Sequence, residues 1–396
     1  IHSSHNMVAI KSKLHNQAYV HLQKKIGMLP SLCVVDQFVA ENSYYRYLKN
    51  EKEVIKNLHF ETKAETAEEA EASKAAEASS GRVEQLLADV ENRMNETLGE
   101  LPEKGQGEKI GILISSTSNE FWGTMKTRYE EAAKDLGIEA EVFEADAEDD
   151  AQGQLDALNT MVTMDFDAII LSPIDGTNLI PGIVAANDAD IPVINLGPGV
   201  DGEALADAGG HLDGKITVNF EEQGSTVAKD MIARMEDGGK VAILSGLEGA
   251  GQSTGRTNGA KAVFESTEGI ELAAVQACDW DTEKAYEATK DILTANPDLE
   301  GIFACNDNMA LAAVQALQEI GNEDVMVYGV DYTSDAKAAI EEGTMMGSMT
   351  YSSAIYTKAA VEMAMLIAQG KTFEEPVYLP LTLVTQDNVA DFEGWK

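Results

Sequence analysis

The sequence is poor in basic residues, in cysteine and in long apolar runs. Its 396 residues include 29 lysines and arginines against 68 aspartates and glutamates, which gives a net charge of −39. Nucleic acids and anionic membranes repel such a chain, so we expect neither as a partner. Three cysteines cannot form a disulfide framework, and no apolar run reaches the ~18 residues of a membrane-spanning helix. The ordered regions of a signal peptide are missing, so none is expected in this sequence.

Catalytic and metal-binding patterns are also missing. Beyond residue 60 the sequence holds a single histidine, His211, so no Ser-His-Asp set can be assembled there. The stretch GLEGAGQSTG at 246–255 is rich in glycine but lacks the Lys-Ser/Thr pair of a phosphate-binding loop. No metal-ligand spacing links cysteines to histidines, and we interpret Cys278 and Cys305 as free packing thiols. We therefore predict no enzyme, no cofactor and no metal site.

The first 107 residues differ in composition from the rest. Residues 1–60 hold five of the six histidines, with 8 lysines and arginines against 4 acidic residues. They form a basic segment of unknown role, either a true domain or an added leader. Residues 61–107 are predicted as an acidic Ala/Glu linker, helical or disordered, followed by a short amphipathic helix over 82–98. The acid-rich remainder fits either a high-salt setting or a general bias toward solubility.

Strand and helix patterns alternate regularly from residue 109 onward. Short apolar runs predict the strands, and amphipathic stretches predict the helices between them. We expect strands at 110–114, 140–143, 168–171, 192–196, 216–219, 241–244, 272–277, 301–304, 325–330, 346–350 and 377–385. A Gly-rich connection is expected at 197–214, and the first helix of the second half at 256–266. Because the pattern restarts after Gly238-Gly239, it predicts an α/β fold of two doubly wound lobes with parallel sheets.

Residues 109–137 place polar and aromatic side chains at the end of a predicted strand. A polar loop at 115–119 follows the strand, and Phe121 and Trp122 begin a helix that Gly137 ends. In open α/β sheets, small ligands bind at the carboxyl ends of the strands. The two aromatic residues are therefore candidates for ligand binding. The alternative is that they form a hydrophobic staple for the helix.

Five segments of the sequence resemble the periplasmic sugar-binding proteins of ABC importers, in particular the ribose-, allose- and galactose-binding group. These segments are KIGILISSTSNEFWGTMK, AIILSPID, IPVINLG, GIFACNDNMALAAVQAL and VMVYGVDYTSD, and the resemblance covers residues 108–396. It implies a type I periplasmic binding fold with two lobes and a hinge of three crossings, near 219–221, 350–352 and 379–381. Lobe 1 is expected to comprise 108–219 and 352–380, and lobe 2 to comprise 220–351 and 381–396.

The resemblance also implies a function. The chain is expected to be a monomeric solute-binding protein on the periplasmic or extracellular face of a membrane. It would capture a monosaccharide or related polyol by hinge closure and deliver it to an ABC permease. The alternative is a ligand-sensing module that reports to a membrane receptor or histidine kinase.

Eleven residues match ligand-binding positions of the family. They are Ser115, Asn119, Phe121, Trp122, Ser172, Asn219, Arg256, Trp280, Asn306, Asp331 and Tyr351. By resemblance, the aromatic rings stack on the faces of a sugar, Arg256 donates to its oxygens, and Asn306 and Asp331 bind its hydroxyl groups. Both of these last two precede predicted helices, so helix capping is the alternative for them.

Several positions depart from the family pattern, which points to a ligand other than ribose. The departures are Gly197-Pro198 in place of a common Asp-Arg pair, Ser172 in place of asparagine, Asn219 in place of serine and Tyr351 in place of glutamine. Another monosaccharide, a polyol, a cyclitol or some other small polar molecule is then expected. Asp175 and Asp213 either bind the ligand in place of the family residues that are missing or serve as turn residues.

Overall fold

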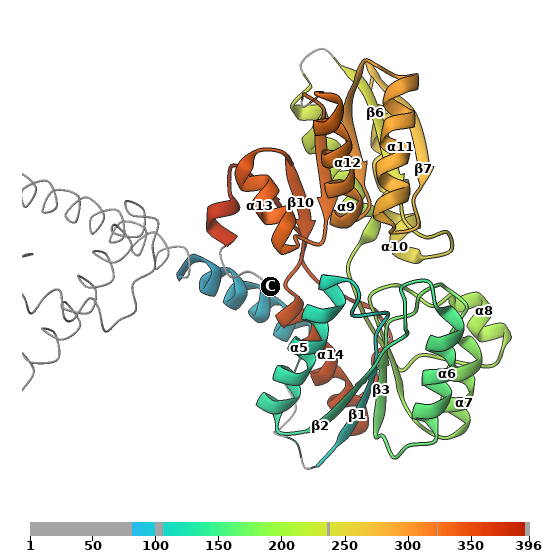
Figure 1. Ribbon diagram of the computed structural model, residues 1–396. Coiled ribbons are helices and arrows are strands. Elements are labelled where there is room, and N and C mark those ends of the chain that lie inside the picture. Colours follow the sequence, from blue (N-terminus) through green and yellow to red (C-terminus); the bar gives the residue numbers. More distant parts are fainter. Residues whose placement is uncertain (1–80, 100–104, 106, 236–237, 323, 393–396) are drawn as a thin grey trace, which may run out of the picture. The chain divides into compact units, whose positions relative to one another are not determined.

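The computed structural model describes residues 81–99, 105, 107–235, 238–322 and 324–392 (Figure 1). The expectations for the basic segment 1–60 and for the Ala/Glu stretch 61–80 lie outside the described residues. Within the described part, two separate six-stranded sheets organise the chain.

The lobe 1 sheet contains only parallel strand pairs among the described residues. Its strand order is β11 (Val377–Tyr378), β5 (Gly214–Thr217), β4 (Val193–Leu196), β3 (Ala168–Leu171), β1 (Lys109–Leu113) and β2 (Glu139–Phe143). Its helices are α5 (Glu120–Leu136), α6 (Ala151–Val162), α7 (Ile180–Asp188), α8 (Gly202–Asp207) and α14 (Ser353–Ala368). Successive strand residues enter different cores: Ile112 joins the core that includes Met125 of α5, whereas Leu113 joins the core that includes Leu158 of α6. This alternation buries both faces of the sheet.

The lobe 2 sheet repeats the same pattern with one antiparallel edge. Its strand order is β12 (Thr382–Thr385), β10 (Gly347–Thr350), β9 (Met326–Val330), β8 (Leu299–Ala304), β6 (Gly239–Ser245) and β7 (Ile270–Ala277), with β12 antiparallel to β10. Its helices are α9 (Phe220–Ala233), α10 (Gly251–Ser266), α11 (Thr282–Ala295), α12 (Asp307–Ile320) and α13 (Ser334–Glu342), followed by the 3₁₀ helix η1 (Val389–Phe392).

Three segments connect the lobes. The chain passes from β5 to α9, returns from β10 to α14, and crosses once more between β11 and β12. In each sheet the first strand lies between the second and the third, so the winding direction reverses beside it. Ligands bind in the crevice at such a reversal. The predicted fold class, two doubly wound lobes joined by three connections, is confirmed.

An additional helix covers residues 81–98, as the amphipathic pattern predicts. Val90 and Met94 are buried in the core that includes α14 residues, and Glu91 forms an ion pair with Lys358 of α14. Lys371 donates a hydrogen bond to the carbonyl oxygen of Leu98. The helix is therefore packed on the body of the protein in the part of the chain that the structure describes.

Three sequence-based boundaries are wrong. The single strand expected at 377–385 is two short strands in different sheets, β11 and β12, with Pro380 between them. The Gly-rich connection 197–214 contains helix α8, which Asp201 caps by accepting two backbone hydrogen bonds. Helix α10 begins at Gly251 instead of residue 256. Glycine disfavours a helix in isolation, but a Cβ at Gly255 would lie 2.6 Å from Phe220, so packing requires glycine at that position.

Helices α9 and α10 approach each other so closely that side chains do not fit between them. A Cβ atom at Gly224 would lie 1.9 Å from the carbonyl oxygen of Arg256, and one at Gly259 would lie 1.9 Å from that of Glu221. These glycines therefore set the distance between the two helices. That distance places the side chain of Arg256 against Gln223 of α9.

We expect Gly259→Ala to lower the free energy of unfolding by about 1–3 kcal/mol, because the added methyl group must push two helix backbones apart. The matched control is Gly123→Ala in α5, where a Cβ meets nothing within 4 Å. That change should stabilise the protein by about 0.5–1 kcal/mol through helix propensity. Urea unfolding of both variants tests the pair, and equal effects would contradict the close-packing explanation.

Candidate functional site

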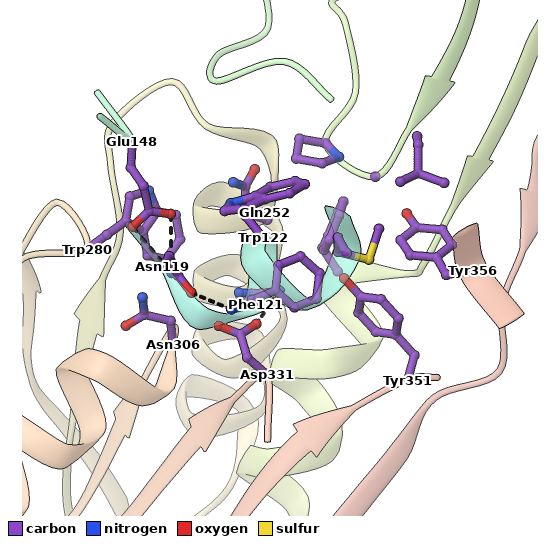
Figure 2. Close-up of a pocket in the computed structure, with 16 residues that line it drawn as sticks. Asn119, Phe121, Trp122, Glu148, Gln252, Trp280, Asn306, Asp331, Tyr351 and Tyr356 are labelled. Atoms are coloured by element: carbon purple, nitrogen blue, oxygen red, sulfur yellow. Dashed lines mark hydrogen bonds and ion pairs between the residues drawn. The ribbon is translucent and has the colours of Figure 1, made fainter. Parts of the chain in front are cut away.

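The two lobes enclose a cavity at the carboxyl ends of their strands. It holds about 480 Å³ of space between atoms, part of which is open to solvent. Figure 2 shows the residues around it. The lining consists of Asn119, Phe121, Trp122, Met125, Glu148, Leu196, Gly197, Pro198, Phe220, Gln252, Arg256, Trp280, Asn306, Asp331, Tyr351 and Tyr356.

Eight of the eleven residues predicted from the resemblance line this cavity, and three do not. Ser115 is buried, and its backbone oxygen accepts a hydrogen bond from Ala145. Ser172 is buried beside Gln154, which donates to its backbone oxygen. Asn219 is exposed and caps α9 by accepting from the Glu222 backbone. The last two are positions at which the resemblance implies a different residue type in the family.

The two turn residues considered as replacements also lie outside the cavity lining. Asp175 accepts hydrogen bonds from the backbone nitrogens of Thr177 and Asn178. Asp213 accepts from the backbone of Val193 and lies 3.6 Å from His211. The turn interpretation accounts for both side chains.

Half of the lining was not predicted from the sequence. Met125 lies one helical turn after Phe121 and Trp122, so helical spacing could have indicated it. Glu148 lies in the loop after β2, at the carboxyl end of the sheet, where the same rule that selected the loop after β1 applies. Gly197 and Pro198 stood out only as departures from the family, yet they form part of the wall.

Aromatic rings form a connected group along the cavity. The ring of Phe121 meets Trp122 edge-on, with centroids 5.1 Å apart, and meets Tyr351 at 5.9 Å. Tyr351 in turn contacts Tyr356 at 4.9 Å. Edge-to-face contacts of this kind are favourable and fix the ring orientations. Phe121 and Trp122 thus face the ligand space from the first turn of α5.

Trp280 reaches the cavity from the loop after β7 through a strained backbone. Asp279 and Trp280 have φ values of 53° and 65°, which bulky residues rarely adopt. Gly246 provides the space for the indole ring, since a Cβ there would lie 2.1 Å from it. Strained residues of this kind concentrate at functional sites.

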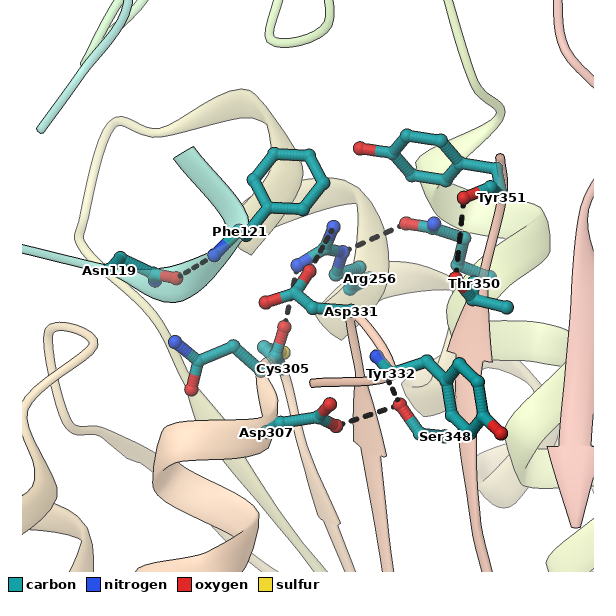
Figure 3. Close-up of polar contacts among 12 residues, drawn as sticks. Asn119, Phe121, Arg256, Cys305, Asp307, Asp331, Tyr332, Ser348, Thr350 and Tyr351 are labelled. Carbon is teal, nitrogen blue, oxygen red and sulfur yellow. Dashed lines mark hydrogen bonds and ion pairs between the residues drawn. The ribbon is translucent and has the colours of Figure 1, made fainter. Parts of the chain in front are cut away.

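Arg256 is a buried, fixed cation. Its Nε donates to Gln223 Oε1 at 2.8 Å, and its Nη1 donates to the carbonyl oxygen of Cys305 at 2.7 Å. Its Nη2 lies 3.8 Å from Asp331 Oδ1, and its guanidinium lies over the ring of Phe220. The side chain is therefore held by groups from several elements, and the carboxylate on its open side is Asp331 (Figure 3).

Asp331 is held in place by a buried carboxylate beneath it. Asp307 accepts hydrogen bonds from Ser348 Oγ and from the backbone nitrogen of Thr333, both at 2.7 Å, and Ser348 accepts from the backbone of Tyr332 at 2.9 Å (Figure 3). Asp331 and Tyr332 have φ values of 111° and 55°. The hydrogen bonds from the backbone nitrogens of Tyr332 and Thr333 therefore fasten the strained loop that carries Asp331.

Burial alters the protonation of three carboxyl groups at this site. It raises the pKa of Asp331 to about 7, where Arg256 opposes the shift and Glu148 adds to it. It also raises the pKa of Glu148, although hydrogen bonds from Asn119 and Trp122 act in the opposite direction. The pKa of the buried Asp307 lies well above its ordinary value for the same reason. Each group thus loses hydration without gaining full charge compensation.

Metal and thiol chemistry receive no support from the described residues. No group of three or more His, Cys, Asp or Glu residues there is arranged to hold a metal ion. Cys278 and Cys305 are free and buried, and burial raises the pKa of both thiols. None of the described helices combines the length and apolar character needed to cross a membrane.

Comparisons with known proteins agree with this geometry. The family model of the periplasmic binding protein domain matches residues 110–372. The chain is 31% identical to the D-allose-binding periplasmic protein of Escherichia coli (strain K12), over 61% of this chain and 78% of the relative.

Solved structures give the same result. A periplasmic solute-binding protein of an ABC transporter from Actinobacillus succinogenes, with bound D-allose, is similar at a TM-score of 0.68 and 31% identity. The match covers 71% of this chain and 99% of that one. A solute-binding protein from Bacillus halodurans with bound myo-inositol is similar at a TM-score of 0.66 and 27% identity, covering 74% and 99%.

Two helix-capping asparagines separate capping from ligand binding. Asn306 and Asn219 each accept a hydrogen bond of 3.0 Å from a backbone nitrogen three residues later, but only Asn306 lines the cavity. We expect alanine at either position to lower the free energy of unfolding by about 1 kcal/mol. Asn306→Ala should also weaken ligand binding, whereas Asn219→Ala should not. Calorimetric titration and urea unfolding of both variants test this, and equal ligand affinities would leave capping as the whole role of Asn306.

The pKa of Asp331 predicts a pH dependence of stability. Its carboxyl group ionises near pH 3.9 in the unfolded chain but near 7 in the folded one, so between these values the folded protein binds the extra proton. Its contribution to the free energy of unfolding is therefore complete below about pH 4 and is lost as the pH rises to about 7. Urea unfolding from pH 4.5 to 8 should show this fall relative to Asp331→Asn. Parallel curves for the two proteins would contradict it.

Proposed function

The chain belongs to the periplasmic binding protein domain family, and on this premise we propose that it captures a small sugar or polyol in the cavity between its lobes and delivers it to an ABC permease. The observation that carries the proposal is the combination of aromatic faces and buried polar groups in one cavity. Solute-binding proteins of this family carry their ligand without changing it, and we assign no catalytic residue. The family places the capture step in the periplasm or at the outer face of the membrane.

The cavity chemistry suits a polyhydroxylated ring. Such a ring presents C–H groups on its faces and hydroxyl groups at its edge. Phe121, Trp122 and Trp280 offer apolar surface for the faces. Asn306 and Asp331 offer hydrogen-bonding groups for the edge, and a hydroxyl missing from the ligand would leave a buried acceptor unpaired.

We further propose that the ligand is enclosed by a hinge motion of the lobes. The lobes would comprise 108–219 with 352–380 and 220–351 with 381–396, and the three connections would act as the hinge. Contacts between the lobes flank the cavity: the backbone nitrogen of Gly176 donates to the oxygen of Gly249 at 3.4 Å, and Ser334 Oγ donates to Glu120 Oε1 at 2.8 Å. An opening motion of the lobes would break both contacts.

The lobe 1 wall favours a ligand other than ribose. Gly197 and Pro198 line the cavity where many relatives are expected to carry an Asp-Arg pair, so this part of the wall has no charged side chain. The nearby Tyr351 and Tyr356 are also uncharged at neutral pH. We therefore propose another monosaccharide, a polyol or a cyclitol as the ligand class.

A thermal-shift screen of the full chain tests the proposed function. The panel contains pentoses, hexoses, linear polyols and inositols, each at high and low salt. A ligand present at 100 times its dissociation constant stabilises the folded state by about 2.7 kcal/mol, which moves the melting temperature by several degrees. We expect at least one compound of the panel to produce such a shift.

Asp331→Asn should reduce the affinity of that compound by about 10- to 100-fold, because the buried carboxylate is replaced by a weaker acceptor. The matched control is Asp213→Asn, which removes an acidic group outside the cavity lining and should leave the affinity unchanged. Calorimetric titration measures both. Equal losses in the two variants would overturn the proposal, and so would the absence of a shift both with every compound of the panel and with their amino derivatives.

A further inference from the structure

The charged residues that line the cavity do not balance. Two are carboxylates, Glu148 from lobe 1 and Asp331 from lobe 2, and one is a guanidinium, that of Arg256. Within the described part of the chain, no other lysine, arginine or histidine belongs to the lining. With all three groups ionised, the cavity carries one negative charge in excess.

Arg256 cannot neutralise both carboxylates. Two of its nitrogens donate to Gln223 and to the backbone oxygen of Cys305, at 2.8 and 2.7 Å, which fixes the direction of the guanidinium. The remaining nitrogen faces Asp331 at 3.8 Å, which is longer than a hydrogen bond. The guanidinium therefore compensates part of the Asp331 charge and none of the charge on Glu148.

Asp331 retains unused acceptor capacity toward the cavity. Its side chain is 9% exposed, and no hydrogen bond from any residue in the described ranges reaches its carboxylate. A buried carboxylate normally accepts several hydrogen bonds, so the missing partners are expected from the ligand.

Glu148 lies on the opposite lobe with only neutral hydrogen-bond donors. Asn119 Nδ2 lies 3.3 Å from both of its carboxylate oxygens. Among the residues that the structure describes, no lysine, arginine or histidine nitrogen lies within 4.0 Å of it. Figure 2 shows Glu148, Asn119 and Trp280 together at one side of the cavity and Tyr351 and Tyr356 at the other. Glu148 thus lies beside an amide and an indole ring, away from the two tyrosines.

We propose that the preferred ligand carries a protonated amine beside its hydroxyl groups, as in an amino sugar or an aminated cyclitol, and that Glu148 binds the ammonium. An ammonium offers three donors and no acceptor, which suits carboxylates with free acceptor positions. It also supplies the positive charge that the lining lacks, whereas with a neutral polyol one of the two carboxyl groups must either stay without a positive partner or carry a proton. This inference rests on the proposed function of the cavity and specifies its ligand class.

Matched pairs of ligands test the inference. Calorimetric titration of the full chain at pH 7.0 compares D-glucosamine with D-glucose, D-galactosamine with D-galactose, and scyllo-inosamine with scyllo-inositol. We expect at least one amine to bind about ten-fold or more tightly than its alcohol. The N-acetylated amine, which keeps the nitrogen but loses the charge, should lose this preference.

Variants assign the preference to Glu148. Glu148→Gln should bring the amine-to-alcohol affinity ratio close to one, and Glu148→Asp, which keeps the charge, should retain part of it. The control is Asp149→Asn, which removes the same charge from the neighbouring residue outside the lining and should keep the ratio. An unfolding curve for each variant establishes that it is folded. A ratio that persists in Glu148→Gln would overturn the role of this residue.

The outcomes distinguish a failure of this inference from a failure of the proposed function on which it rests. If neutral sugars or polyols bind at least as tightly as their amines in every pair, the inference is wrong and the proposed function stands. Proton uptake on binding of a neutral ligand, measured in buffers of different ionisation enthalpy, would also overturn it, because a proton would then supply the missing charge. If neither amines nor alcohols bind, the proposed function itself is wrong.

Discussion

The site depends on a carboxylate that is buried before any ligand arrives. The side chain of Asp331 is 9% exposed, so its carboxylate has lost most of its contact with water. The fixed guanidinium of Arg256, 3.8 Å away, replaces only part of the stabilisation that water would give to the charge. The cost of this burial appears as a pKa raised to about 7. A ligand that donates hydrogen bonds to Asp331 removes this cost. Part of the binding free energy therefore comes from the removal of the unfavourable burial of this carboxylate in the unliganded protein.

The unfavourable conformations at the site persist because several surrounding contacts hold each of the residues concerned. Four of the five non-glycine residues with positive φ among those described lie in two pairs, Asp279-Trp280 and Asp331-Tyr332, and each pair carries a cavity residue. Asp307 and Ser348 fasten the second pair from below. The glycines of α9 and α10 play the same role for Arg256, since they bring Gln223 close enough to hold it. Strain and close packing therefore serve the positions of individual side chains.

The structural features that depend on local sequence pattern were predicted correctly, whereas several features that depend on packing between distant elements were missed. Apolar runs and the restart after residue 238 were enough for two doubly wound lobes, and the end of the first strand was enough to select Phe121 and Trp122. Asp331 was selected through the family resemblance. The early start of α10 was not predicted, because glycines in a sequence indicate a loop. Only the close approach of the neighbouring helix α9 shows why glycines stand in this helix. Glu148 was not predicted as a cavity residue, because an acidic loop in an acidic chain is typical of a solvent-exposed surface. Its burial arises only in the folded protein, where Asn119 and Trp122 donate hydrogen bonds to it.

The division of charge between the lobes links ligand binding to closure. Glu148 belongs to lobe 1 and Asp331 to lobe 2, and the negative charge of Glu148 already raises the pKa of Asp331 in this structure. Moving the lobes together without a ligand brings these like charges closer while water leaves, and both effects oppose closure. A ligand that donates to both carboxylates reverses the sign of the interaction, because each carboxylate is then attracted to the molecule between them. On the proposed hinge motion, the same two residues would favour the open form of the empty protein and the closed form of the loaded one, which is the differential stabilisation that a ligand-driven hinge requires.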